Sequence, residues 1–263
     1  AGTKILRITP PVPGVDGQDI FGKKISGTGR RVEIRAGKNV KDNNGVFLAT
    51  AKGRVVVADK SVRVEPIQQV TGDVDFKSGN VNFFGVVQID RDVLDEFKVK
   101  GDQGVRVSGM AGSAHIESAQ GDVEIGGGMQ GMGRGTVVAG GKVKVKYLNH
   151  AEVRAAGDVT VFAESVNSKI TSGGKVYVHG KIVGGEIHGQ SSLEVVSLGS
   201  PLGIKTLVVL AKPDGIVLVR KILHARSIVR IGGHSHEFLD DVPGPIRVTF
   251  DVKTHAFKIL PGS

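Results

Sequence analysis

The sequence lacks cysteine and tryptophan altogether, and only 5% of its 263 residues are aromatic. Without cysteine the chain can form no disulfide, no zinc–thiolate site and no thiol nucleophile. No apolar run is long enough to cross a bilayer as a helix, so we expect no membrane span. With only nine prolines, an extended proline-rich chain is excluded as well.

Glycine, by contrast, is abundant, and its 39 residues are scattered among valine and isoleucine. That pattern is typical of many turns between strands rather than of disorder. The net charge is +9, with 26 acidic residues spread among the basic ones. Such a surface can meet an acidic protein face, nucleic acid or anionic lipid, or it can serve solubility alone.

The chain repeats itself about every 17 residues. The segment Gly121–Ile125 recurs as Gly141–Val145, Gly157–Val161 and Gly174–Val178, and in degenerate form as Ser191–Val195. Three series of apolar residues keep this spacing. The first series is Val70, Val87, Val105, Val123, Val143, Val159, Val176, Leu193 and Leu210. The second is Val64, Val81, Val99, Ile116, Val137, Val153, Ile170, Ile187 and Ile204. A looser third series is Met110, Met129, Leu148, Val166 and Ile182.

Each repeat alternates apolar and polar residues, which is the period of a strand, and branched residues dominate it. Three short strands per repeat, separated by glycine-containing corners, describe one coil of a solenoid. We therefore predict an all-β fold, a right-handed parallel β-helix in the form of a single-stranded solenoid with coils of about 17 residues. The polar residues between the apolar ones should line one outer face, and they are Arg106, Glu124, Lys144, Thr160, Tyr177 and Glu194.

The repeat divides the chain into three predicted parts. Residues 61–210 form the β-helix. Residues 1–60 are predicted to be a small N-terminal β cap over the first coil, because open sheet edges aggregate unless they are covered. Residues 211–263 are predicted to be a C-terminal β segment that continues or caps the helix. The strands expected outside the repeat are 31–34, 54–57, 216–219, 227–231, 246–252 and 256–260, the last two forming a hairpin with Thr254 and His255 near its turn.

Several short motifs follow one another along the chain in a characteristic order. They are Pro13–Gly17 with Gly22–Ile25, then Gly37–Val40, then Gly72–Val81, and finally Ala-x-Gly-Asp-Val units. In this order the chain resembles the flagellar assembly protein A family, while the Gly-Asp-Val units alone also resemble the polymer-forming bactofilins. The family resemblance implies a bacterial cytoplasmic protein that supports flagellar assembly or polar placement through protein contacts, without catalysis. Recruitment to the cell pole is a further expectation. Family members usually carry a long helical segment after the coils, where this chain has only Ala211–Gly215.

The strongest stretch of one charge sign is 220–236, which contains no acidic residue. Its candidate partner-binding residues are Arg220, Lys221, Arg226 and Arg230. They could dock a protein with an acidic face, or they could form an ordinary solvated face. Nucleic acid is not an expected partner, because its readers usually add stacking aromatic residues and this stretch has none.

A second candidate group consists of Phe162, Tyr177 and His179, which fall on neighbouring predicted coils. Exposed aromatic residues on a rigid face are typical anchors for a protein partner. Phe162 could instead fill the core at a corner.

No motif predicts catalysis, a cofactor or a metal site. Gly126–Gly131 matches the spacing of a dinucleotide-binding loop, but a strand is predicted at 136–138 where that loop needs a helix, so we interpret it as a corner. His234 and His236 could share one face of a strand. They have no third ligand at a recognisable spacing, and we predict an exposed loop there.

The sequence therefore predicts a non-enzymatic scaffold that binds another protein, with homo-oligomerisation left open. A self-polymerising cytoskeletal β-helix module and a polysaccharide-active β-helix enzyme are the alternatives. The enzyme is disfavoured because Asp122 and Asp158 fall at corners, in the slot that Lys142 and Lys175 fill in other coils, rather than forming a carboxylate pair. The absence of tryptophan also argues against a platform for stacking sugars.

Overall fold

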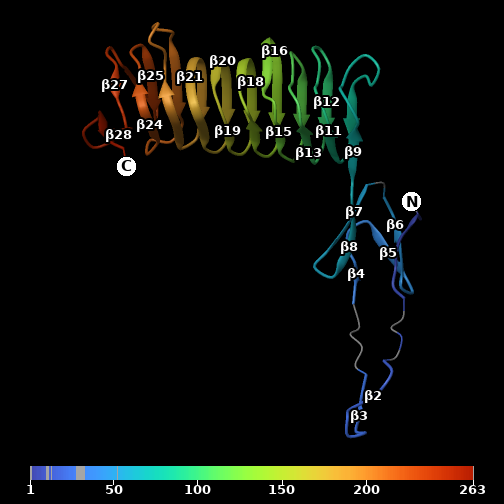
Figure 1. Ribbon diagram of the computed structural model, residues 1–263. Coiled ribbons are helices and arrows are strands. Elements are labelled where there is room, and N and C mark those ends of the chain that lie inside the picture. The colour runs from blue at the N-terminus through green and yellow to red at the C-terminus, as the bar shows by residue number, and fades with distance from the viewer. Residues whose placement is uncertain (1, 10–11, 13, 28–32, 52, 263) are drawn as a thin grey trace. The chain divides into compact units, whose positions relative to one another are not determined.

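The computed structural model describes residues 2–9, 12, 14–27, 33–51 and 53–262. The chain divides into two compact units, Ala1–Ile67 and Gln68–Ser263. Every regular element within these described ranges is a β-strand (Figure 1). The all-β class predicted from the repeat is therefore confirmed.

The strands up to residue 65 are β1 (Lys4–Arg7), β2 (Gly17–Gln18), β3 (Lys24–Ile25), β4 (Arg35–Ala36), β5 (Val40–Asn43), β6 (Val46–Ala49), β7 (Arg54–Ala58) and β8 (Ser61–Glu65). From residue 67 to 161 they are β9 (Ile67–Val70), β10 (Val81–Phe83), β11 (Val86–Ile89), β12 (Lys98–Gly101), β13 (Gly104–Val107), β14 (His115–Ser118), β15 (Val123–Ile125), β16 (Met129–Ala139), β17 (Val143–Val145), β18 (Leu148–Ala155) and β19 (Val159–Val161). The remainder are β20 (Ser165–Ser172), β21 (Val176–Gly189), β22 (Ser192–Leu198), β23 (Thr206–Leu210), β24 (Ile216–Leu223), β25 (Ser227–Ile231), β26 (His234–Glu237), β27 (Val242–Pro243), β28 (Ile246–Asp251) and β29 (Ala256–Pro261).

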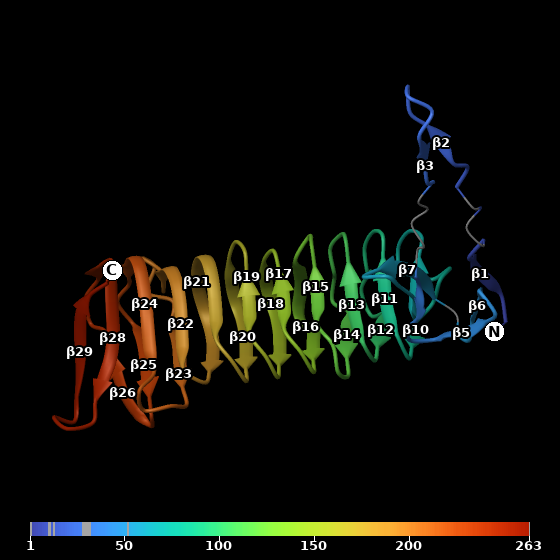
Figure 2. The same cartoon turned by 90° about the horizontal axis from the view of Figure 1, so that it is seen from below.

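The second unit is a parallel β-solenoid of about nine turns with about 18 residues per turn (Figures 1 and 2). Its turns stack so that equivalent strands pair in parallel along three faces. On face 1 the paired column runs Val87, Val105, Val123, Val143, Val159, Val176, Leu193 and Val217. On face 3 it runs Val81, Val99, Ile116, Val137, Val153, Ile170, Ile187, Val208 and Val229. The predicted stacking of the two main series is confirmed over most of its length.

The ends of these two series differ from the prediction. Leu193 pairs with Val217 rather than with Leu210, and Ile187 pairs with Val208 rather than with Ile204. Both errors have one cause: the corners at 199–205 and 211–215 lengthen the last coils, so a fixed step of 17 falls short. At the other end, Val64 pairs antiparallel with Val55 in the first unit and is not part of the column.

Face 2 lies between the other two and carries the third column. The column runs Val74, Val93, Ala111, Met129, Leu148, Ser165, Ile182, Leu198 and Leu223. The sequence series was one residue off at two places, because Ala111 and Ser165 point inward instead of Met110 and Val166. In the first turns this face is held by single bridges. A bridge of one residue has almost no alternation of apolar and polar side chains, so the sequence there does not indicate which residue points inward.

The interior of the solenoid is a continuous apolar core. All of the residues in the columns of faces 1 and 3 are buried. Burying one valine, leucine or isoleucine side chain contributes about 1.5–3 kcal/mol. No single coil can cover its own apolar side, so this contribution is realised only when coils stack.

The glycine-containing corners are built around aspartates. Asp158 Oδ1 accepts a hydrogen bond from the backbone N–H of Lys175, in the next coil, at 2.9 Å. A Cβ atom on Gly174 would collide with that same oxygen. The Nζ of Lys142, from the preceding coil, lies 3.0 Å from Asp158 Oδ2, and Asp122 bonds to the N–H of Lys142 in the same manner at 2.7 Å. At these two corners, aspartate in one coil therefore requires glycine in the next, Gly141 after Asp122 and Gly174 after Asp158.

These bonds hold the corner carboxylate in its charged form. The N–H of Lys175, followed by the side chain of Lys142, lowers the pKa of Asp158 below its usual value. Asp122 and Asp158 thus occupy corners, where they join coils and do not face each other as a catalytic pair would.

Beyond the last parallel strands the chain turns antiparallel. Strand β26 pairs with β25, while β27 and β28 pair with β24, and β28 forms a hairpin with β29. The predicted strands at 216–219 and 227–231 and the predicted hairpin are confirmed by β24, β25, β28 and β29. Thr254 and His255 lie in the turn of that hairpin.

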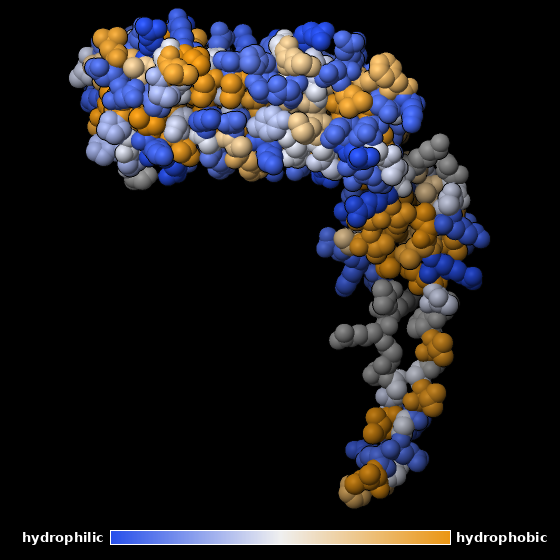
Figure 3. Space-filling model, turned by 45° about the horizontal axis from the view of Figure 1, so that its top comes forward, coloured by the Kyte–Doolittle hydropathy of each residue, from blue (hydrophilic) through white to orange (hydrophobic). Residues whose placement is uncertain are grey.

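The first unit is a separate set of small sheets. Strand β6 lies between β1 and β5, β8 lies between β4 and β7, and β2 pairs with β3. Apolar side chains gather on the visible face of this unit in Figure 3. Val55 and Val57, both in β7, are exposed. The strand predicted at 54–57 is confirmed as β7. Of the strand predicted at 31–34, the first two residues lie outside the described residues, and Glu33 and Ile34 are not in a strand. A cap formed by residues 1–60 stays a prediction.

Candidate functional site

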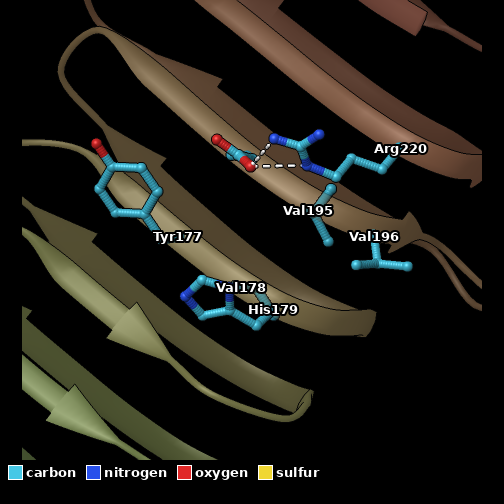
Figure 4. A pocket seen from close by; sticks show the side chains of 7 residues that line it. Tyr177, Val178, His179, Val195, Val196 and Arg220 are labelled. Carbon is cyan, nitrogen blue, oxygen red and sulfur yellow. Dashed lines mark hydrogen bonds and ion pairs between the residues drawn. The ribbon is translucent and has the colours of Figure 1, made fainter. Parts of the chain in front are cut away.

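A cluster of aromatic and charged side chains lies where face 1 ends and the chain turns toward face 2 (Figure 4). Tyr177 is an outward residue of β21, with Thr160 of β19 and Glu194 of β22 as its strand partners. His179 follows two residues later on the same side of the strand. The Nε of Arg220, in β24, donates a hydrogen bond of 2.8 Å to Oε1 of Glu194. Three successive turns thus contribute to one cluster.

Phe162 extends this cluster by one more turn. Its ring stacks on the imidazole of His179, with centroids 5.7 Å apart and an interplanar angle of 8°. The side chain is 54% exposed, so Phe162 does not fill the core. Position 162 comes directly after the inward Val161, and a residue there points out of the corner.

The hollow within the cluster is small. It is lined by Tyr177, His179, Glu194 and Arg220 among others, and its volume is about 50 Å³. Sites for small molecules usually enclose about 300–1,000 Å³. This hollow has room for a few water molecules, so the cluster offers a surface for contact and no enclosed ligand site.

A shallow depression adjoins the cluster, and Val196 lines both hollows. It contains Lys221 and the ion pair between Lys181 Nζ and Glu164 Oε2, which are 3.1 Å apart. Together these groups form what we call the aromatic–basic surface, in which Tyr177 is half-buried and the others are exposed. Its members are Phe162, Tyr177, His179, Lys181, Arg220 and Lys221. Here three cations meet two carboxylates, those of Glu164 and Glu194.

The structure separates the other two predicted residues from this surface. Arg230 is an exposed residue of β25, which belongs to face 3 and pairs with β23 and β26. Arg226 lies in the turn before β25, where its side chain packs beside Gly203. Stretch 220–236 is therefore wrapped around the solenoid, and its positive charges do not form one patch.

The two candidate histidines are engaged with aromatic rings. His234 stacks on Phe250 with centroids 4.0 Å apart, and His236 meets Phe238 edge-on at 4.8 Å. Both lie in strand β26 and not in a loop as predicted. Within the part of the chain that the structure describes, no group of three or more histidine or acidic side chains is arranged to hold a metal ion. Over the same ranges, no helix is long and apolar enough to cross a membrane.

The sequence interpretation missed a second surface, over the first four turns of the solenoid. A groove of about 490 Å³ has an apolar floor formed by Phe76, Leu94, Phe97 and Met110. Phe76 is 95% exposed and packs edge-on against Phe97 at 5.2 Å. The signal in the sequence was the presence of large apolar residues at positions where the neighbouring coils have aspartate, glycine or serine.

The rim of this groove is acidic, and its members are Asp92, Asp95 and Glu96. Asp92 Oδ1 accepts a hydrogen bond from the N–H of Met110 at 2.7 Å, and Asp95 Oδ1 accepts one from the N–H of Ser113 at 2.6 Å. Each aspartate thereby joins its coil to the next. We call this feature, floor and rim together, the acid-rimmed groove.

Comparison with known proteins identifies both parts of the chain. The model of the Flagellar Assembly Protein A beta solenoid domain matches residues 66–215. The model of the Flagellar Assembly Protein A N-terminal region matches residues 1–60. No curated protein and no solved structure matches the chain.

Proposed function

The chain belongs to the flagellar assembly protein A family, and we propose that it acts there as a non-enzymatic scaffold that binds another protein through the aromatic–basic surface. The observation that carries the proposal is that four successive turns bring together one cluster, made of Phe162, then Tyr177 and His179, then Glu194, and finally Arg220. Aromatic and arginine side chains are the commonest anchors of protein interfaces.

The solenoid supports this role because it holds those side chains in place before a partner arrives. Tyr177 and Glu194 are fixed by the register of paired strands, and Arg220 is held by Glu194. Ordering a mobile side chain on binding costs about 0.5–1.5 kcal/mol. A surface that is already ordered avoids much of that cost.

The proposed partner has an acidic face. Lys181 and Arg220 are paired with carboxylates, but both remain about half exposed, and Lys221 lies beside them. Exposed pairs of this kind contribute little to stability. An acidic partner can therefore draw these cations into new contacts at small cost.

The test is a pull-down from bacterial lysate with the tagged chain as bait, followed by a binding measurement on the protein retained. We expect Arg220→Glu combined with His179→Ala to weaken binding by at least about tenfold, since both an anchor and a charge are lost. Arg230→Glu is the matched control, because it reverses an exposed arginine on another face. Equal binding by the double variant and the wild type would remove this surface from the proposal.

Location in the cytoplasm, with recruitment to the cell pole, is the placement we propose from family membership. Fluorescence microscopy of the tagged chain in flagellated cells tests it. A signal spread evenly through cells that carry polar flagella would contradict polar recruitment.

Self-polymerisation is a second candidate, and strand β29 is the observation that favours it. This strand is mostly exposed along its length and pairs antiparallel with β28. Exposed strands can pair with another copy, although lysine and proline, here Lys258 and Pro261, are the usual protection against it. Light scattering across a range of protein concentrations distinguishes the scaffold from the polymer, because only a polymer keeps increasing in mass as the concentration rises.

A further inference from the structure

We propose that the acid-rimmed groove is a second docking site, for a short basic segment of another protein that carries a large apolar side chain. The site lies on the first four turns of the solenoid, while the aromatic–basic surface is formed by later turns. Its partner is also of opposite charge. The inference therefore goes beyond the proposed function and does not depend on it.

The floor of the groove is an unusual exposure of large apolar groups. Phe76 is almost fully exposed, and Leu94 and Met110 are each more than 40% exposed. Single exposed apolar residues are common on proteins, but several that line one groove mark a contact site. An apolar side chain seated among them would bury surface at about 25 cal/mol per Å².

The acidic rim favours an occupant with positive charge. Three acidic residues and no basic residue line the groove, in a chain whose net charge is +9. Each aspartate uses one carboxylate oxygen for the backbone of the next coil. Because one bond to an N–H leaves a carboxylate further acceptor sites, both can still bind lysine or arginine from a partner.

Glu96 is the most available of the three. It is 75% exposed, and its nearest cation is Arg134 Nη1 at 3.4 Å, itself 67% exposed. An ion pair this exposed contributes about 0–1 kcal/mol. A basic partner can therefore displace Arg134.

The dimensions fit an extended peptide. Phe76, Leu94, Met110 and Gln130 come from four successive turns. Turns spaced about 4.8 Å apart give a groove about 14 Å long, which corresponds to about four residues of extended chain. The groove is open along its side, so it can accept a segment within a longer protein.

The test is fluorescence anisotropy with the full chain and a labelled short peptide that places phenylalanine and leucine between two pairs of lysines. Two control peptides replace the lysines by glutamates, or the two apolar residues by serines. We expect the basic apolar peptide to bind, both controls to bind at least about tenfold more weakly, and affinity to fall as salt rises. Equal binding of the acidic control would overturn the proposal, as would the absence of any binding by the basic peptide.

Variants of the chain locate the contact. Leu94→Ser with Glu96→Lys should weaken peptide binding at least about tenfold, because anchor and charge are both altered. Both side chains are exposed, so the fold should tolerate the change. Leu239→Ser with Glu237→Lys is the matched control, and Arg220→Glu should leave the peptide affinity unchanged. Full peptide binding by the groove variant would overturn the assignment. So would self-association of the wild type that Leu94→Ser abolishes, because the occupant would then be a second copy.

Discussion

At the scale of the residue, the core contains several buried hydroxyl groups, and those of Ser113, Ser165 and Ser227 have no hydrogen-bond partner among the described residues. Ser165 lies in the face 2 column between Leu148 and Ile182 and is fully buried. Its hydroxyl has no hydrogen-bond partner among the residues that the structure describes. A buried hydroxyl without a partner costs about 1–3 kcal/mol.

Replacing that hydroxyl should therefore stabilise the protein. We expect Ser165→Ala to raise the free energy of unfolding by about 1 kcal/mol, because the desolvation cost disappears and alanine fits the same space. Denaturant unfolding followed by circular dichroism measures the change. Ser235→Ala, at an exposed position in β26, should have no effect, and a loss of stability in Ser165→Ala would show that the hydroxyl is satisfied.

A substitution at a corner should lower the free energy of unfolding instead of raising it. Gly174→Ala should destabilise the protein by about 1–3 kcal/mol, because the new Cβ would collide with Oδ1 of Asp158 and the coils would have to move apart. Gly17→Ala is the control, since nothing lies within 4 Å of its Cβ position. The same unfolding measurement applies, and equal effects at both positions would contradict the role of the corner.

At the scale of the element, the carboxylate of Asp251 links the turn of the β28–β29 hairpin to Lys258 in its second strand. The side chain of Lys258, followed by the backbone N–H of Lys253, lowers the pKa of Asp251 to about 2. A lowered pKa in the folded state means that ionised Asp251 stabilises the hairpin above its ordinary pKa of 3.8. That contribution is lost as the pH falls from about 4 through about 2.

Hydrogen exchange of the hairpin amides should report this loss. We expect protection across β28 and β29 to fall between pH 4 and pH 2 in the wild type, after correction for the intrinsic exchange rate. In Asp251→Asn the protection should be lower at pH 6 and nearly independent of pH over that window. A wild-type hairpin whose protection does not change would mean that Asp251 does not hold it.

At the scale of the whole molecule, each turn contacts only its neighbours, so stability should be a sum over turns. Deleting residues 159–175 removes one full turn and lets Val143 stack on Val176 in the same register. We expect this variant to fold, with a circular dichroism spectrum like that of the wild type. Deleting only 159–167 shifts the following strands to the wrong faces and should prevent folding. If both deletion variants folded, or if neither did, the result would contradict the stacking of one residue per turn in each column.

The sequence by itself determined the columns of faces 1 and 3, because an inward residue on a strand must be apolar and the corners recur at nearly constant spacing. Val123, Val143, Val159 and Val176 were placed next to one another from spacing alone, and the structure pairs them. The outward position of Tyr177 followed from the same alternation. Family membership also came from motifs in the chain, and the family models match both parts.

Only the tertiary structure decided where each corner sends its side chains. It placed Arg220 beside Glu194 and His179 but sent Arg230 to another face, because the path around the solenoid separates residues that are close in sequence. It also showed that Met110 points out where Ala111 points in. A period fixes which turn a residue belongs to, but corners of variable length break the alternation, and side-chain direction there depends on contacts with the next coil.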